Sequence, residues 1–335
     1  MDSTSITFND ILYTKTVFLD RDVLSPHFLP ERILHRENEI KKIMKNLSPI
    51  FSNKKPKNIF IYGKTGTGKT SSIKYIIKEL NKFNLNAKIL YINCRIYNTK
   101  YKILQKVSAD LINFNKNGFP PNVLYEKIFN YVSDNKVHLI LVLDEIDSVR
   151  DINELVYTVT RANDDLDSGS ISFIGISNKV DFKRKLDQRS KSALIEAEII
   201  FPPYKVEQLR EILLQRAQIG FKENCFDISS INLAAAIAAS ETGDARYALK
   251  LLIYAGDIAD ERGDSIVRDI HVELARKAAE MDIVIETIAT LPEHQQIALY
   301  AITHLSLNGS KYQRLMNTEK DIFLIGEVYE MYKTF

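Results

Sequence analysis

The chain has 335 residues and a mass of 38.4 kDa, a length that two or three domains would fill. Its 45% apolar and 26% charged residues are typical of a globular protein, which excludes a disordered chain, a collagen-like fibre and a disulfide scaffold. The net charge of +2 does not by itself indicate a nucleic-acid partner. Because the chain has neither an apolar run of about 18 residues nor a signal-like N-terminus, we expect a cytoplasmic protein with no membrane partner.

Helical and strand patterns alternate up to about residue 201. Apolar side chains at spacings of three and four predict a helix over 40–47 that ends at Pro49. The run 138–145, HLILVLDE, is almost wholly apolar before its two acids, as in a central parallel strand covered on both faces. The other strands are expected over 58–62, 87–93 and 172–177. This alternation predicts an α/β domain with a parallel sheet flanked by helices.

After Phe201-Pro202-Pro203 the pattern becomes helical throughout. Glycines mark candidate helix breaks near Gly220, Gly243, Gly256 and Gly263. A further helical stretch begins near residue 291. We therefore expect three domains: a base over 1–204, an all-helical domain over 205–282 and a third over 283–335.

A glycine-rich loop connects the first expected strand to the next helix. GKTGTGKT, residues 63–70, fits G-x-x-x-x-G-K-[ST] and stands in that strand–helix context. Glycines let backbone N–H groups surround a polyphosphate, and the positive end of the following helix faces it. Lys69 is expected to reach the β- and γ-phosphates, and the Thr70 hydroxyl to ligate Mg²⁺. The predicted nucleotide-binding residues of this segment are Gly63, Thr65, Gly66, Thr67, Gly68, Lys69, Thr70 and Ser71.

Polar residues that follow later elements complete the predicted site. Asp144 and Glu145 end a strand about 80 residues after the loop; we expect Asp144 to hold Mg²⁺ and Glu145 to polarise the attacking water. Asn178 follows the next strand and can orient that water or contact the γ-phosphate. Arg246, at an expected helix start in GDARYAL, can reach the γ-phosphate. Taken singly, Asn178 also fits a turn residue and Arg246 a surface arginine.

Basic residues cluster in two segments, 95–116 and 179–191. The first carries five basic residues against one acid, interleaved with Tyr97, Tyr101 and Phe114. Such a segment can meet a phosphate backbone, although charge alone favours a solvated helix face. Cys94 and Cys225 are far apart, so we expect buried, reduced thiols, and the six scattered histidines lack metal-ligand spacing.

The order of these parts resembles the AAA+ ATPases, and more narrowly the archaeal origin-recognition-type replication initiators. The resemblance is carried by RDVLSPHFLPERILHRENEI, IYGKTGTGKT, INCR, LDQRSKSALIEAEIIFPPY and GDARYALKLL, and covers about residues 18–335. It implies a P-loop AAA+ sheet domain, a helical lid and a winged-helix DNA-binding domain. About 50 residues follow Ile283, fewer than that winged domain has in the family, so we expect only a partial one.

The resemblance also implies roles that spacing does not. Residues 24–36 are expected beside the adenine, Tyr204 and Arg216 in the nucleotide pocket, and Arg246 as the lid's sensor arginine. Residues 95–119 match the insertion that contacts origin DNA, with Arg95, Lys100, Lys102 and Lys106 as candidate contacts. Where some relatives carry an arginine that reaches a neighbouring subunit, this chain has Ala193, and Arg189 is the nearest candidate.

The leading hypothesis is an ATP-dependent initiator that binds double-stranded origin DNA and helps recruit the replicative minichromosome maintenance helicase. Binding and slow hydrolysis of ATP with Mg²⁺ would act as its switch, and other initiator copies are possible partners. One alternative is a regulator that retains ADP and acts through protein contacts. Another is an AAA+ motor or clamp-loader subunit, disfavoured because neither an aromatic-hydrophobic pore loop nor a zinc-binding cysteine quartet is recognisable.

Overall fold

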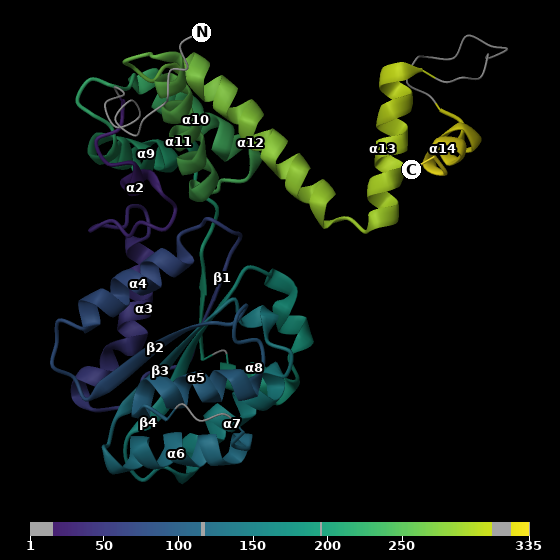
Figure 1. Cartoon of the computed structure of the whole chain (residues 1–335). Coiled ribbons are helices and arrows are strands. Elements are labelled where there is room, and N and C mark those ends of the chain that lie inside the picture. The colour runs from purple at the N-terminus through teal and green to yellow at the C-terminus, as the bar shows by residue number, and fades with distance from the viewer. Residues whose placement is uncertain (1–15, 115–117, 195, 310–322, 335) are drawn as a thin grey trace, which may run out of the picture. The chain divides into compact units, whose positions relative to one another are not determined.

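The computed structural model describes residues 16–114, 118–194, 196–309 and 323–334. Its contacts divide the chain into two compact units, Met1–Val272 and Glu273–Phe335. Figure 1 shows a twisted sheet with helices packed around it, and a group of helices that follows it in the chain. Among the described residues, no helix is long and apolar enough to span a membrane.

Five parallel strands form the sheet of the first unit. They are β1 (Ile59–Tyr62), β2 (Ala87–Asn93), β3 (His138–Asp144), β4 (Ser170–Ser177) and β5 (Ala197–Ile200), in the order β2-β3-β4-β1-β5. The register sets Asn93 beside Asp144 and Tyr62 beside Ser177, so the carboxyl ends of the strands meet at one edge. The expected parallel sheet is confirmed. The short edge strand β5 was not predicted.

Two apolar layers cover the two faces of the sheet. The alternation within β3 shows this directly, because Leu139 and Leu141 belong to one core cluster while Ile140 belongs to the other. The first cluster is closed by α5 (Lys100–Ile112), α6 (Pro121–Asp134) and α7 (Ile152–Asp165). The second is closed by α3 (Glu37–Leu47) and α4 (Lys69–Leu80). The short elements before residue 201 are α2 (Arg21–Leu24), η1 (Ser48–Ser52), η2 (Ile146–Ser148), η3 (Val180–Lys185) and α8 (Gln188–Leu194).

The helical part after the sheet begins with α9 (Val206–Gly220), α10 (Ile228–Glu241) and α11 (Ala245–Arg262). The N-terminal segment that includes α2 packs on this part, since the Leu19 N–H donates to the Gly220 carbonyl at 2.8 Å and α2 contacts α9 and α11. The expected boundary at residue 204 therefore assigns residues 17–24 to the base domain, although they pack against the helices of the lid.

The predicted helix break at Gly256 is wrong, because Gly256 lies inside α11. A Cβ on Gly256 would stand 2.3 Å from Cζ of Phe18. The Phe18 ring itself stacks on Phe221 with 5.2 Å between ring centroids. Gly256 thus serves close packing of a ring against the helix and not a chain reversal.

Helices α12 (Asp269–Thr290), α13 (Glu293–Asn308) and α14 (Ile325–Tyr332) complete the described chain. The boundary between the two units falls within the first turn of α12, which continues past the expected domain boundary at 282. Within the second unit, α13 contacts α14, and the Tyr332 hydroxyl lies 2.6 Å from Nδ1 of His294. The predicted helix after residue 291 is confirmed as α13.

Candidate functional site

The phosphate-binding loop, residues 63–70, connects β1 to α4. Gly66 and Gly68 adopt φ angles of 64° and 87°, which glycine reaches without strain. Gly68 is the N-cap of α4, so Lys69 and Thr70 form the first turn of that helix. The loop therefore faces the positive end of α4, as an anion-binding turn requires.

Lys69 is buried at the centre of this loop. Its Nζ donates hydrogen bonds to the carbonyl oxygens of Gly63 at 2.7 Å and Lys64 at 2.6 Å. Burial lowers the pKa of Lys69 from 10.5 to about 8; Arg246 lowers it further, whereas Asp144 opposes the shift. The ammonium thus feels one carboxylate and a second cation, and an added polyanion would stabilise its charged form.

A carboxylate at the end of β3 lies beside the helix that carries Lys69. Thr70 Oγ1 donates to Asp144 Oδ2 at 2.9 Å, and the Tyr91 hydroxyl donates to the same oxygen. Burial, followed by this hydrogen bond, raises the pKa of Tyr91. Thr70 and Asp144 supply two adjacent oxygen donors of the kind that Mg²⁺ prefers. Tyr91 was not predicted as part of the site.

Glu145 departs from the strand that precedes it. It adopts a φ of 54°, and its N–H donates to Asp144 Oδ1 at 2.9 Å. Arg95 Nε lies 3.1 Å from Glu145 Oε2, close enough for an ion pair. This oxygen is buried and accepts no hydrogen bond within the part of the chain that the structure describes. One carboxylate oxygen is therefore buried, whereas the Glu145 side chain as a whole is 26% exposed and is balanced by one arginine.

The lid approaches the loop through the start of α11. Asp244 caps this helix, since its carboxylate accepts from the backbone N–H of Arg246 at 2.7 Å. The Ala245 N–H donates to the Gly66 carbonyl at 3.2 Å. A Cβ on Gly66 would lie 1.5 Å from Asp244 Oδ1, so only glycine admits this approach. Arg246 therefore directly follows Ala245, whose backbone contacts the loop.

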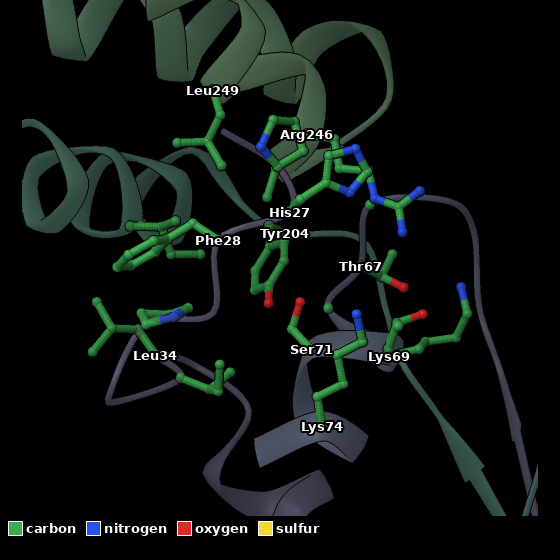
Figure 2. A pocket seen from close by; sticks show the side chains of 18 of the residues that line it. His27, Phe28, Leu34, Thr67, Lys69, Ser71, Lys74, Tyr204, Arg246 and Leu249 are labelled. Atoms are coloured by element: carbon green, nitrogen blue, oxygen red, sulfur yellow. The ribbon is translucent and has the colours of Figure 1, made fainter. Parts of the chain in front are cut away.

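A cavity of about 550 Å³ lies between the loop, the strand ends, the lid and the segment 26–34. Figure 2 shows Arg246 and Leu249 reaching it from the lid helices, Lys69 and Ser71 from α4, and Phe28 from the N-terminal segment. Its polar lining on one side and its apolar lining on the other suit a ligand with a polyphosphate and a ring.

Arg216, on α9, borders the apolar side of the cavity. It is buried, and its Nη2 donates to the carbonyl oxygens of Ser25 at 3.1 Å and Phe28 at 3.2 Å. Burial lowers the pKa of Arg216 to about 10. Its Nη1 has no hydrogen-bond partner among the described residues. A buried donor of this kind, in a lining residue, favours a polar ligand.

The structure brings most of the predicted site residues to this cavity. Those that line it are Gly66, Thr67, Gly68, Lys69, Thr70, Ser71, Asp144, Glu145, Asn178, Tyr204, Arg216 and Arg246. Gly63 and Thr65 are not among the lining residues, although the Gly63 carbonyl contacts Lys69. Of the segment 24–36, expected beside the base, residues 26–28, 30 and 32–34 line the cavity. His27, one of the six histidines, is among these lining residues and is exposed.

The basic segment after β2 forms α5 over Lys100–Ile112, with Tyr97 before the helix and Phe114 after it. Tyr97, Tyr101 and Phe114 are partly buried against the core cluster, so these rings are not free to stack on bases. Lys106 pairs with Asp110 at 2.8 Å, and Lys100 lies 3.8 Å from Glu154. Lys102 is 3.4 Å from Asn98 Oδ1. Of these three lysines only Lys102 is exposed, and the aromatic rings are partly buried by the fold.

Three further predicted residues lie elsewhere. Cys94 is buried and Cys225 only partly, and both are free thiols; burial raises the pKa of the Cys94 thiol to about 12. Arg189, on α8, lines a separate cavity of about 650 Å³ with residues of α7. It does not line the cavity beside the phosphate-binding loop.

Comparison with known proteins follows the same division of the chain. Residues 52–181 match the family model of an AAA domain, and residues 210–277 match the Cdc6 AAA+ ATPase-type lid domain. The chain is 41% identical over 332 residues to ORC1-type DNA replication protein 1 of Archaeoglobus fulgidus, spanning 97% of this chain and 78% of the relative. It is 39% identical to the ORC1-type DNA replication protein of Thermococcus kodakarensis, over 99% of this chain and 80% of the relative.

The fold comparison agrees. The structure of the Aeropyrum pernix ORC1 protein in complex with DNA matches with a TM-score of 0.77 and 35% identity, over 96% of this chain and 82% of that one. These matches confirm the resemblance first seen in the loop, the acidic strand end and the lid arginine. The chain belongs to the ORC1-type DNA replication proteins, a family of replication-initiator AAA+ ATPases.

Proposed function

We propose that the cavity binds ATP with Mg²⁺ and that its occupancy switches this initiator between two lid arrangements. The proposal is carried by one observation: Lys69, Asp144 and Arg246 come from three separate segments and line one cavity. Their charges, two positive and one negative, match a triphosphate with a divalent cation. Arg216 Nη1, which has no hydrogen-bond partner within the described part of the chain, offers a donor on the opposite side of the cavity.

Each residue has a role that its position supports. Lys69 would leave the carbonyl oxygens of its own loop to bind phosphate oxygens, and Thr70 and Asp144 would hold Mg²⁺. Bound ATP would supply the phosphoanhydride bond, and Glu145 would orient and deprotonate water there. Asn178 would position that water and Arg246 would contact the γ-phosphate. Because Arg95 lies 3.1 Å from the Glu145 carboxylate, we expect slow hydrolysis.

Calorimetry and a turnover assay test this assignment. Lys69→Ala should abolish binding of ATP·Mg²⁺, because the loop loses its buried cation. Lys78→Ala is the matched control, since Lys78 is an exposed lysine on the same helix α4. Absence of any heat and any affinity for ATP·Mg²⁺ in folded wild-type protein would refute the proposal.

We further propose that the lysines of α5 contact double-stranded origin DNA. Lys102 and Lys106 are four residues apart on α5, and reversing both to glutamate should weaken binding. The slope of log affinity against log salt should fall by up to about two, one per lost phosphate contact.

Lys41 and Lys45, exposed at the same spacing on α3, provide the control double reversal. Arg95 is left unchanged because its ion pair with Glu145 would mix DNA binding with hydrolysis. An unchanged affinity and slope would leave α5 an ordinary solvated face.

The rival function is a regulator that retains ADP and acts through protein contacts. Two observations favour it. Tyr97 and Tyr101 pack against the core and so have less ring surface for stacking on bases, and Lys106 pairs with Asp110, which reduces its positive charge toward DNA. Absence of DNA binding at about 50 mM salt, with ADP recovered from the purified protein, would support this rival. The minichromosome maintenance helicase and further initiator copies remain the proposed protein partners, to be tested by co-purification with and without ATP.

A further inference from the structure

Arg36 is a buried arginine outside the cavity that contacts two distant segments of the chain. It is the N-cap of α3 and only 2% exposed, and it is not among the residues that line the cavity. Its Nε donates to the Thr67 carbonyl at 2.8 Å and its Nη2 to the Pro202 carbonyl at 2.6 Å. Its Nη1 donates to the His35 carbonyl at 3.1 Å.

The first of these bonds concerns the back of the phosphate-binding loop. A loop that turns its N–H groups toward an anion must turn carbonyl groups away from it. Thr67 is fully buried, so its carbonyl oxygen has no access to water. Without the Arg36 donor this acceptor would be left unsatisfied, which disfavours the loop conformation that binds anions.

The second bond concerns the connection from the sheet to the lid. Pro202 belongs to the segment that leads from β5 to α9, and the Arg36 guanidinium also lies over the Tyr204 ring at 3.8 Å from its centroid. The Tyr204 hydroxyl in turn is so near Gly68 that a Cβ there would lie 2.5 Å from it. One planar guanidinium therefore contacts the loop and the connection to the lid at once.

The chemistry requires arginine. Among the described residues Arg36 forms no ion pair with a carboxylate, so carbonyl dipoles and an aromatic face compensate its buried charge. A lysine ammonium is a single point donor and cannot span the Thr67 and Pro202 carbonyl groups in one plane. Burying a charged guanidinium costs free energy, and a residue that served only to fill the core would not need that charge.

We propose that Arg36 is a positioning residue that holds the phosphate-binding loop in its anion-binding conformation and ties it to the base–lid connection. The inference rests on the nucleotide binding proposed above. Because Arg36 acts behind the loop, its effect falls on the part of the site that ATP and ADP share. It differs in this from Arg246, which is expected to act on the γ-phosphate alone.

Titration of ATP and of ADP into the wild type, Arg36→Lys and Arg36→Ala tests the proposal. Arg36→Lys should lose affinity for both nucleotides by the same factor, about ten- to a hundredfold, since a buried acceptor is left unpaired. Guanidinium ion on the order of 10 mM, far below unfolding concentrations, should partly restore the affinity of Arg36→Ala. Arg21→Lys, at an exposed arginine paired with Asp257, should bind as the wild type does.

Three results would overturn the proposal: unchanged affinity in Arg36→Lys, a loss confined to ATP, or no rescue by guanidinium. A wild type that binds neither nucleotide would overturn the proposed function and this inference together. Hydrogen exchange on the wild type covers the case in which the variants fold poorly. ADP should slow exchange of the amides of 63–70 and of Phe201 and Tyr204 in the connection, and protection of the loop alone would refute the link.

Discussion

The buried ammonium of Lys69 predicts that nucleotide binding takes up a proton in alkaline solution. Its pKa is lowered from 10.5 to about 8, chiefly by burial. A polyphosphate beside it brings negative charge, which favours the protonated form and restores a higher pKa. Raising the pH from 7 to 9 therefore deprotonates Lys69 in the free protein, and this proton must be taken up again when nucleotide binds.

The size of the effect follows from the pKa. At pH 9, one unit above a pKa of about 8, roughly 90% of the free protein has lost this proton. Affinity should then be about tenfold weaker than at pH 7, or about 1.4 kcal/mol. The same shift acts on stability with a definite sign. Between pH 8 and 10.5 the unfolded chain binds more protons at Lys69 than the folded one, so stability rises with pH across that window by roughly 3 kcal/mol.

Calorimetric titration of ADP at pH 7 and pH 9, in two buffers of different protonation enthalpy, measures this proton. The heats should differ between buffers at pH 9 by nearly one proton per nucleotide and should agree at pH 7. Lys69→Arg is the control, because arginine stays charged over this range. Equal heats in both buffers at pH 9, with an affinity that does not change from pH 7, would refute the buried-ammonium reasoning.

Three further substitutions have definite expected outcomes. Glu145→Gln should bind ATP as the wild type does but turn it over at least about a hundredfold more slowly, because the general base is lost; normal turnover would remove Glu145 from its assigned role. Arg246→Ala should weaken ATP more than ADP, by about 1.5–3 kcal/mol for a charged hydrogen bond, and an equal loss for both would contradict γ-phosphate contact. Gly256→Ala should lower the free energy of unfolding by about 1–3 kcal/mol through overpacking against Phe18, and a raised melting temperature would show that helix propensity prevails.

Local sequence patterns predicted β1, β3 and β4 because these strands are largely buried on both faces. All seven residues of β3 are buried, and this leaves a nearly continuous apolar run in the sequence. The edge strand β5 lacks that signal, since of its four residues only Ile199 is buried. At Gly256 the sequence pattern predicts a helix break that does not occur. The glycine is needed because the Phe18 ring, more than 200 residues away in the sequence, packs against the helix there.

The basic segment after β2 shows where composition cannot decide between two uses of the same residues. Lysines alternating with tyrosines and phenylalanines fit a nucleic-acid surface, and they fit an amphipathic helix equally well. Tyr101 on α5, with Tyr97 before the helix and Phe114 after it, packs against the core, whereas Lys102 is exposed and Lys106 pairs with Asp110. Only the helix face that each residue occupies separates stacking from core packing, and that face depends on where the helix meets the sheet.

The residues that support the site were the hardest to predict, for a physical reason. A motif such as residues 63–70 records the side of the loop that faces its ligand, because that chemistry dictates residue types at fixed spacing. The back of the loop needs only a donor for a buried carbonyl, and any segment that passes behind it can provide one. Here Arg36 provides it from 31 residues before Thr67, and reaches Pro202 across 166 residues. Tyr91 illustrates the same limit, since its bond to Asp144 depends on the register between β2 and β3. Supporting residues of this kind follow from the fold and therefore become visible only once the fold is known.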